Sequence, residues 1–412
     1  MRINPDIFKQ YDIRGIYPSE INEKVACKIG YDFVVFLGLP RNAKIIIGRD
    51  LRKSSKPLAE SFIKGALEAG ADVVDIGPST SPMLYFGVSL LKMDAGAMIT
   101  ASHNPIKYNG IKLLRRGGDP INGKEIKLFM KKTPPPSAAI QKVSIRQSDI
   151  SQKYLEEIAK DFKLVNKIKI SVDPGKGAAK FLAPELIRRL GLLESKKPEI
   201  FFSFDYDADR LEIKDKKGKE IRKDVAGVII AEATVKKGDV VTYDLRCSRA
   251  VPEYFRARGI TAVPSKVGRY DIIRTMKQRN ASFGMELTGH YYFKKMNYDS
   301  DPFFSLRKLL ESIDESRQKI SETAEFFEKY SHSGILNFKI KNFEKIIERL
   351  KNEYRAGSQN AIDGLTIEFS NWWFNIRPSN TEPLVRMVIE AKNQKLLEEK
   401  KKELLKIITA EK

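Results

Sequence analysis

Cysteine, tryptophan and histidine are scarce in this sequence, which has two, two and three of them in 412 residues. Cys27 and Cys247 stand far apart, so we expect neither a disulfide framework nor a zinc site with Cys ligands, but two reduced thiols. No apolar run reaches the roughly 20 residues of a membrane helix. The first residues also lack the apolar segment of a signal peptide. These absences predict a cytoplasmic protein without a membrane partner.

Negative charge is also in deficit, with 53 Asp and Glu against 74 Lys and Arg, a formal net charge of +21. The basic residues are spread along the chain, and no aromatic ladder is interleaved with them. We therefore predict a solvated, Lys-rich surface and no nucleic-acid partner. A basic nucleic-acid binder stays open as an alternative that rests on charge alone, and binding that weakens with salt would support it.

Length and hydrophobic content indicate several packed domains rather than one. Strand-like runs at 44–48, 72–76 and 95–99 alternate with helical segments, which is typical of βαβ crossovers and a mostly parallel sheet. The same alternation recurs twice, whereas the last segment has the element order of a small α+β domain. The predicted domains are 1–150, 151–236, 237–330 and 331–412.

The first loop with a chemical character is Thr100-Ala101-Ser102-His103-Asn104-Pro105, which follows the predicted strand 95–99. Loops at the carboxyl ends of parallel strands are where α/β folds place their sites. Small residues before Ser102 and polar residues after it make a tight turn that presents the hydroxyl, and an ordinary Asn-Pro turn is the plainer alternative. Lys112 is a candidate for moving protons near Ser102.

A second loop places Asp205, Asp207 and Asp209 at alternate positions after a mostly apolar strand-like run. Their side chains would converge and offer the hard oxygen ligands that suit Mg²⁺. An EF-hand is excluded because its glycine and glutamate positions hold Arg210 and Lys216. A solvated acidic turn is the remaining alternative.

Two further loops offer groups for sugar hydroxyls and for phosphate. Glu286, Thr288 and His290 lie in a segment that begins with Gly284, although a lone histidine is more often structural. The other loop has the sequence RPSNTEP, which starts at Arg377, and Arg386 follows it. Arginine side chains and free backbone amides in a turn make a phosphate-binding concavity. A capped surface turn would account for its serine and asparagine, but not for the arginines.

Taken in order, these loops and the segment Tyr11-Asp12-Ile13-Arg14-Gly15 resemble the α-D-phosphohexomutase family, the phosphomannomutase/phosphoglucomutase group. The resemblance covers essentially the whole chain. It implies an α/β fold class, with three similar mixed α/β domains plus a smaller C-terminal α+β domain around a central cleft. Each domain would contribute one loop, in the order phosphoserine, metal, sugar and phosphate. It also implies a phosphosugar substrate, and it leaves the oligomeric state open.

The resemblance assigns roles to residues of this chain. The implied catalytic residues are Ser102, Lys112, His103, Arg210 and His290. The implied substrate-binding residues are Tyr11, Arg14, Lys266, Glu286, Thr288, His290, Arg377, Ser379, Asn380, Thr381 and Arg386. The implied metal site holds Mg²⁺ through Asp205, Asp207, Asp209 and the phosphorylated Ser102. A hexose 1,6-bisphosphate is the implied activator.

The implied reaction moves a phosphoryl group between the 1- and 6-positions of mannose or glucose phosphate through phosphoserine and a 1,6-bisphosphate. A glucosamine or pentose phosphate mutase of the same family stays open, as does a non-catalytic phosphosugar-binding relative. The sequence departs from the family where Tyr206 stands in place of the usual glycine. It also has an interval from Asp173 to Asp205 that is short for the family, so we expect a shortened second domain.

Overall fold

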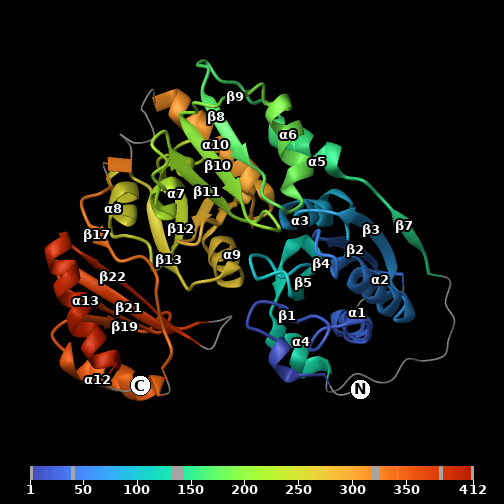
Figure 1. Ribbon diagram of the computed structural model, residues 1–412, viewed down its shortest axis with the longest axis horizontal. Helices are drawn as coiled ribbons and strands as arrows, with labels where there is room; N and C mark the ends of the chain where they lie inside the picture. The colour runs from blue at the N-terminus through green and yellow to red at the C-terminus, as the bar shows by residue number, and fades with distance from the viewer. Residues whose placement is uncertain are drawn as a thin grey trace. The chain divides into compact units, whose positions relative to one another are not determined.

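A computed structural model describes residues 3–38, 42–130, 143–316, 324–325, 327–340, 342–379 and 384–409 of the chain. The chain forms two compact units, 1–221 with 288–316 and 222–287 with 317–412. Helices and strands alternate along both units, as Figure 1 shows, which confirms the predicted α/β fold class. No described helix combines the length and the apolar character needed to cross a membrane. The four domain boundaries stay predictions.

The N-terminal part of the first unit is built on one sheet, with strand order β1-β5-β4-β2-β3-β7 and β6 beside β5. The strands are β1 (Ile13–Ile16), β2 (Lys44–Arg49), β3 (Asp72–Pro78), β4 (Ala95–Ile99), β5 (Tyr108–Arg115), β6 (Pro120–Ile121) and β7 (Ile145–Gln147). The pairs β2–β3, β2–β4 and β3–β7 are parallel, but β5 is antiparallel to its neighbours. The sheet is therefore mixed rather than mostly parallel, because the short connection between β4 and β5 makes them adjacent and antiparallel.

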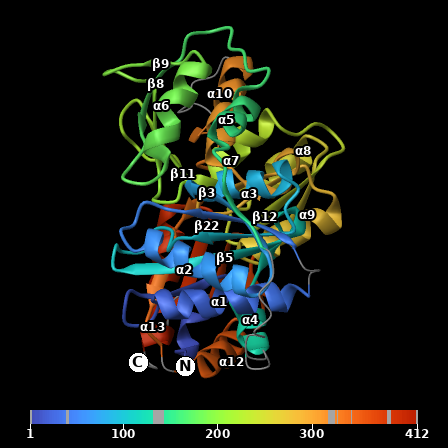
Figure 2. The ribbon, with the colours of Figure 1, turned by 90° about the vertical axis from the view of Figure 1, so that its right-hand side faces the viewer.

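Helices complete this part of the unit. They are η1 (Pro5–Ile7), α1 (Glu23–Leu37), α2 (Ser55–Glu68), α3 (Ser81–Leu90), η2 (Arg116–Gly118) and α4 (Gly123–Met130). Helices α1 and α2 lie side by side in Figures 1 and 2, with the rings of Phe33 and Phe62 6.0 Å apart. Helix α3 begins where the Thr80 side chain accepts a hydrogen bond from the Met83 amide. That cap fixes the start of α3 directly after β3.

The rest of the first unit carries a smaller sheet, with strand order β11-β10-β8-β9. The elements of this part of the chain are α5 (Ser151–Ala159), β8 (Lys169–Asp173), α6 (Ala179–Arg189), β9 (Leu193–Glu194), β10 (Ile200–Phe204) and β11 (Leu211–Asp215). The segment 288–316, which also belongs to the first unit, holds β15 (Tyr291–Phe293), η3 (Lys294–Met296), β16 (Asp299–Ser300) and α10 (Pro302–Ser316), and β15 pairs antiparallel with β16 outside the four-stranded sheet. Strand β10 pairs in parallel with β8 and antiparallel with β11. This pairing places the loop that joins β10 to β11 at the carboxyl end of β10.

The second unit begins with three parallel strands and their helices. These elements are α7 (Lys223–Glu232), β12 (Val240–Asp244), α8 (Ala250–Ala257), β13 (Thr261–Ser265), α9 (Arg269–Arg279) and β14 (Phe283–Met285). Its last part is an antiparallel sheet with β17 (Ser331–His332), β18 (Leu336–Phe338), β19 (Ser358–Asn360), β20 (Leu365–Glu368), β21 (Trp372–Pro378) and β22 (Val385–Ala391). Helices α12 (Phe343–Glu353) and α13 (Gln394–Thr409) cover one face of that sheet, as Figure 1 shows. The predicted α+β order of the last segment matches these elements.

The core of the C-terminal sheet gives a stability prediction. Leu404 of α13 is fully buried against the sheet, whereas Lys402 on the same helix is exposed. Leu404→Ala should lower the free energy of unfolding by about 2–5 kcal/mol, because it removes buried methyl groups and leaves a cavity. Lys402→Ala should change it by less than about 0.5 kcal/mol. Urea unfolding of both variants checks this, and equal midpoints would contradict the packing.

Candidate active site

The loop between β4 and β5 holds Ser102 in a constrained conformation. Ser102 is buried, and its φ of 50° lies in the left-handed region that non-glycine residues rarely adopt. Its amide donates to Thr100 Oγ1 at 2.9 Å, and its Oγ lies 3.4 Å from His103 Nδ1. Strained backbone of this kind is held only where surrounding contacts fix it, and it is common at functional sites.

Asp50 and Arg52 hold the serine loop through hydrogen bonds, and the sequence analysis did not identify either residue as part of the site. The guanidinium of Arg52 donates to the carbonyl oxygens of Ser102 and Asn104 at 2.7 and 2.8 Å. Its third carbonyl partner is Pro105, at 3.0 Å. Asp50 pairs with Arg52 Nε at 3.0 Å and accepts from Thr100 Oγ1 at 2.8 Å. The sequence pattern that could have revealed them is an acidic and a basic residue directly after the β2 segment, because the carboxyl ends of parallel strands lie at the same sheet edge as the serine loop.

The loop between β10 and β11 gathers three carboxylates. One oxygen from each of Asp205, Asp207 and Asp209 lies within 4.8 Å of the others. The amides of Asp209 and Arg210 donate to Asp205 Oδ1 at 3.1 and 3.3 Å, which folds the loop back on itself. Ala208 has a φ of 50°, so this loop also has a residue in the left-handed region. The three side chains thus converge, as the alternate spacing of the Asp residues predicted.

The donor set of this cluster fits a divalent cation. Asp205 Oδ2 and Asp207 Oδ1 are buried and make no hydrogen bond within the described part of the chain, whereas Asp209 Oδ1 lies 3.3 Å from His290 Nε2. Buried carboxylate oxygens without donors are costly, and a hard cation satisfies several of them together. The three Asp residues are therefore the ones that would hold a metal ion, which would supply charge stabilisation for a phosphoryl group.

Lys112 of β5 reaches the same carboxylates. Its Nζ lies 2.6 Å from Asp207 Oδ2 and 2.6 Å from Asp209 Oδ2. Ser81, the first residue of α3, donates from its Oγ to Asp207 Oδ2 at 2.6 Å. Burial alone would lower the pKa of Lys112, but Asp207 and Asp209 raise it well above its ordinary value. Lys112 therefore carries its proton at neutral pH.

The carboxylates of the cluster differ in their electrostatics. Burial, together with the negative charges of Asp209 and Asp207, raises the pKa of Asp205 well above its usual range. Burial also opposes ionisation of Asp209, but the neighbouring Lys112 and the imidazole of His290 outweigh it and hold the pKa of Asp209 well below that range. The cluster thus concentrates negative charge that Lys112 only partly offsets, and this favours an additional cation.

Several other predicted site residues lie around this cluster within the first unit. His290 Nε2 lies 3.3 Å from Asp209 Oδ1, and its Nδ1 lies 3.0 Å from Thr288 Oγ1. Arg210 Nε approaches Asp205 Oδ2 at 3.8 Å. Arg14 pairs with Asp12 and donates to Asn104 of the serine loop at 2.7 Å. The N-terminal Arg14 and the distant His290 therefore flank the serine and aspartate loops.

His103 and Tyr11 have less defined surroundings. The His103 side chain is exposed, yet desolvation by the surrounding loop and the charges of Arg210 and Arg14 lower the pKa of its ring to about 3. The imidazole is therefore neutral at pH 7. Tyr11 is half-buried, with its hydroxyl 3.5 Å from the side-chain nitrogen of Gln10.

The predicted sugar- and phosphate-binding residues of the second unit fall into two groups. Glu286 is buried and accepts a hydrogen bond from the Gly268 amide at 2.7 Å, while Lys266 is exposed just after β13. Arg377 and Arg386 face each other across β21 and β22. The predicted Ser379, Asn380, Thr381 and Arg386 follow Arg377 in sequence, but Asn380 and Thr381 lie outside the described residues.

The phosphate-loop arginine has an acidic partner that the sequence analysis did not identify. Arg377 is buried, and its Nε lies 2.9 Å from Asp363 Oδ2. The same Asp363 oxygen accepts the Val267 amide at 3.0 Å. Asp363 precedes Gly364, whose φ of 72° suits a turn that needs glycine. This carboxylate therefore fixes the position of the Arg377 side chain.

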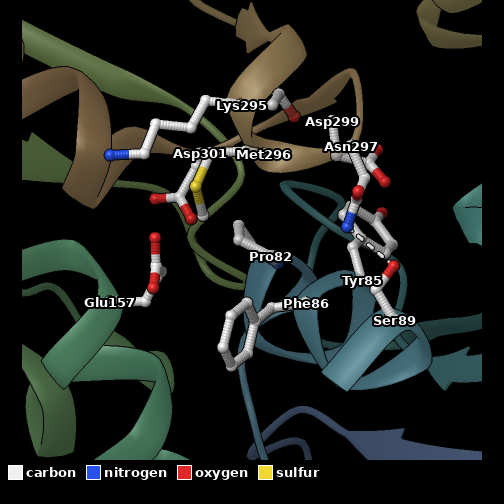
Figure 3. Close-up of a pocket in the computed structure, with 11 residues that line it drawn as sticks. Pro82, Tyr85, Phe86, Ser89, Glu157, Lys295, Met296, Asn297, Asp299 and Asp301 are labelled. Atoms are coloured by element: carbon white, nitrogen blue, oxygen red, sulfur yellow. Dashed lines mark hydrogen bonds between the residues drawn. The ribbon is translucent and has the colours of Figure 1, made fainter. Parts of the chain in front are cut away.

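A small cavity of about 90 Å³ lies in the first unit, and none of the three Asp residues of the aspartate loop is among its lining residues (Figure 3). Its walls come from α3, α5 and the segment from η3 to α10, and Asn297 donates to Ser89 Oγ at 2.6 Å across it. Asp301 lines it, and burial raises the pKa of that carboxyl to about 7. Sites for sugar-sized ligands are usually roughly 300–1,000 Å³, so this cavity is too small for a hexose phosphate.

Comparison with known proteins agrees with this geometry. Models of the phosphoglucomutase/phosphomannomutase family match residues 5–134 with alpha/beta/alpha domain I, 222–330 with alpha/beta/alpha domain III and 336–407 with the C-terminal domain. The phosphomannomutase of Methanocaldococcus jannaschii is 35% identical, over 98% of this chain and 97% of the relative. The phosphomannomutase/phosphoglucomutase of Pseudomonas putida is 28% identical, over 94% of this chain and 92% of the relative.

A solved structure extends the comparison to the fold. The crystal structure of a phosphoglucomutase/phosphomannomutase family protein from Burkholderia thailandensis superposes with a TM-score of 0.88 at 26% identity. The match covers 99% of this chain and 98% of that one. The resemblance inferred from the loop motifs is therefore confirmed over the whole chain.

Proposed function

This chain belongs to the phosphoglucomutase/phosphomannomutase family, and we propose that it interconverts the 1- and 6-phosphates of mannose or glucose. The choice of sugar is supported by the names of the relatives, one a phosphomannomutase and one a phosphomannomutase/phosphoglucomutase. The observation that carries the proposal is the presence, in one compact unit, of a buried Ser102 with a positive φ and of three carboxylates that converge within 4.8 Å of one another.

The proposed reaction has two halves that balance. Phosphorylated Ser102 gives its phosphoryl group to a free sugar hydroxyl, so the Oγ–P bond breaks and a sugar O–P bond forms. One proton passes from the sugar hydroxyl to the serine oxygen. The bisphosphate then presents its other phosphate, which Ser102 accepts with return of the proton. The hexose 1,6-bisphosphate that acts as intermediate would also serve as the activator that first phosphorylates Ser102.

The side chains of the site would divide the work between charge and protons. Mg²⁺ held by Asp205, Asp207 and Asp209 would offset negative charge on the phosphoryl group, and most catalysis of this reaction is positioning and electrostatics. Lys112 is the first candidate to carry the proton, because it is protonated and adjacent to the cluster. His290, with both ring nitrogens near oxygen atoms, is the second.

Further residues would recognise the rest of the substrate. Glu286 of the second unit would bind sugar hydroxyls, a role that the family resemblance also implies for Thr288 and His290 of the first unit. Arg377 and Arg386 would bind the phosphate that does not react, and Ser379, Asn380 and Thr381 would supply further donors. The ion pair between Arg377 and Asp363 supports this role, because a guanidinium with a fixed side chain loses less freedom when it binds a phosphate.

A coupled mutase assay tests the proposal. It offers mannose 1-phosphate, glucose 1-phosphate and glucosamine 1-phosphate separately, each with Mg²⁺ and the matching 1,6-bisphosphate. We expect turnover of mannose or glucose phosphate to exceed that of glucosamine phosphate. Turnover of glucosamine phosphate alone would overturn the substrate choice. Tight binding without turnover of any sugar would indicate a non-catalytic phosphosugar-binding protein.

Lys112 gives a prediction on proton transfer. Lys112→Met should lower kcat by about 10²–10⁴, the usual contribution of a positioned acid or base. The same change should tighten Mg²⁺ binding, because it removes a cation that lies 2.6 Å from two carboxylates of the cluster. Lys124→Met, an exposed control in the same domain, should change neither quantity. Calorimetric Mg²⁺ titration and steady-state kinetics measure both, and unchanged kcat would remove Lys112 from the mechanism.

A further inference from the structure

The guanidinium of Arg52 is the point at which the serine loop is held. Its side chain is 1% exposed, and it donates to three carbonyl groups of the loop region, those of Ser102, Asn104 and Pro105. Asp50 neutralises its charge and also accepts the Thr100 hydroxyl that receives the Ser102 amide. Both the amide and the carbonyl of Ser102 therefore depend on the Asp50–Arg52 pair. Any movement of the guanidinium would be transmitted to Ser102.

The aspartate loop places an aromatic ring on this guanidinium. Tyr206 stands between Asp205 and Asp207, and its ring centroid lies 4.7 Å from the Arg52 Cζ atom. That distance is within the range of a cation–π contact. Because Asp50 and the three carbonyls take up the N–H groups in the guanidinium plane, an additional partner is accommodated best on its face.

The backbone of the aspartate loop restricts the position of the Tyr206 ring. A Cβ atom at Gly177 would lie 1.8 Å from the Tyr206 carbonyl oxygen, so the glycine permits a direct backbone contact there. Ala208, two residues on, has its φ of 50°, and the Asp209 amide closes the loop on Asp205. The ring therefore moves with the aspartate loop rather than independently of it. A change in the backbone of residues 205–209 would be passed to Arg52.

We propose that Tyr206 is a positioning residue that couples cation binding at the three Asp residues to the conformation of the Ser102 loop. A cation drawn in by the buried carboxylate oxygens tightens the aspartate loop, and the ring then presses on the guanidinium that holds the serine loop. This contact thereby sets the position of Ser102 relative to the three Asp residues that would hold the cation. The catalytic meaning of the coupling rests on the proposed function, but the coupling itself does not.

Hydrogen exchange with and without Mg²⁺ tests the coupling without any substrate. In the unmodified protein, Mg²⁺ is expected to slow exchange both in the aspartate loop, 204–211, and in the serine loop, 100–106. Tyr206→Gly should keep the protection of the aspartate loop but lose about 5- to 30-fold of the protection in the serine loop, the range that a cation–π contact provides. Tyr206→Phe should behave as the unmodified protein, and Tyr206→Leu as the glycine variant.

Several outcomes would overturn the proposal. One is serine-loop protection that survives in Tyr206→Gly, and another is a Tyr206→Phe variant that loses it. Protection of neither loop by Mg²⁺ in the unmodified protein is a third. In kinetics, Tyr206→Gly should lower kcat by about 10-fold with little change in KM for the sugar phosphate. If the unmodified protein turned over no sugar phosphate, the proposed function would fail, while the exchange data would still decide whether Tyr206 couples the loops.

Discussion

Ser102→Ala is expected to reduce mutase turnover by at least about 10³-fold, because it removes the oxygen that carries the phosphoryl group between the two halves of the reaction. The loss should come from chemistry rather than folding. The Ser102 Oγ has a distant contact, 3.4 Å from His103, whereas the backbone contacts with Thr100 and Arg52 do not involve the hydroxyl. Transfer of labelled phosphate from a hexose 1,6-bisphosphate to the protein should vanish with the activity.

Two companion variants separate the hydroxyl from the backbone at this position. Ser102→Gly should also be inactive, yet it should raise the free energy of unfolding by about 1 kcal/mol, because glycine relieves the strain of a φ of 50°. Ser19→Ala, at an exposed serine, should leave turnover unchanged. Mutase activity close to that of the unmodified protein in Ser102→Ala would remove phosphoserine from the mechanism.

The arrangement of strands was predictable only in part. The alternation of apolar runs predicted β2, β3, β4 and β10 to within a few residues, because buried parallel strands have a strong hydrophobic signal. The antiparallel return of β5 was not predicted, since its register depends on pairing with β4 across the sheet. That register places Lys112 opposite Met98 and so determines which carboxylates the lysine meets.

In the candidate site, too, the features that depend on neighbouring residues in sequence were predictable, and those that depend on distant residues were not. The serine and aspartate motifs were visible because each is a short segment of polar residues directly after a buried strand. Arg52 and Ser81 were missed because their partners lie 50 and 126 residues away in sequence, which no local pattern encodes. Tyr206 was noted only as a departure from a family pattern. Its contact with Arg52 depends on how the loops that follow strands of two different sheets meet within the first unit.

The metal site gives the second prediction with a large expected effect. Asp207→Asn should weaken Mg²⁺ binding by at least about 10- to 100-fold and lower turnover by at least a similar factor, because one of three charged oxygen donors becomes a neutral amide. Asparagine keeps the side-chain shape, so the hydrogen bond from Ser81 Oγ, 2.6 Å long, can be retained. A general collapse of the loop is therefore not expected.

The control and the contrary result for Asp207→Asn are both accessible. Glu212→Gln, at an exposed acid on β11 just beyond the loop, should leave Mg²⁺ affinity and turnover unchanged. Calorimetric titration of the substrate-free protein measures metal affinity independently of catalysis. If Asp207→Asn bound Mg²⁺ as tightly as the unmodified protein, the carboxylates of Asp205, Asp207 and Asp209 would not be the metal ligands. Lys112 would then be the cation for which that cluster is built, and turnover without added metal would follow.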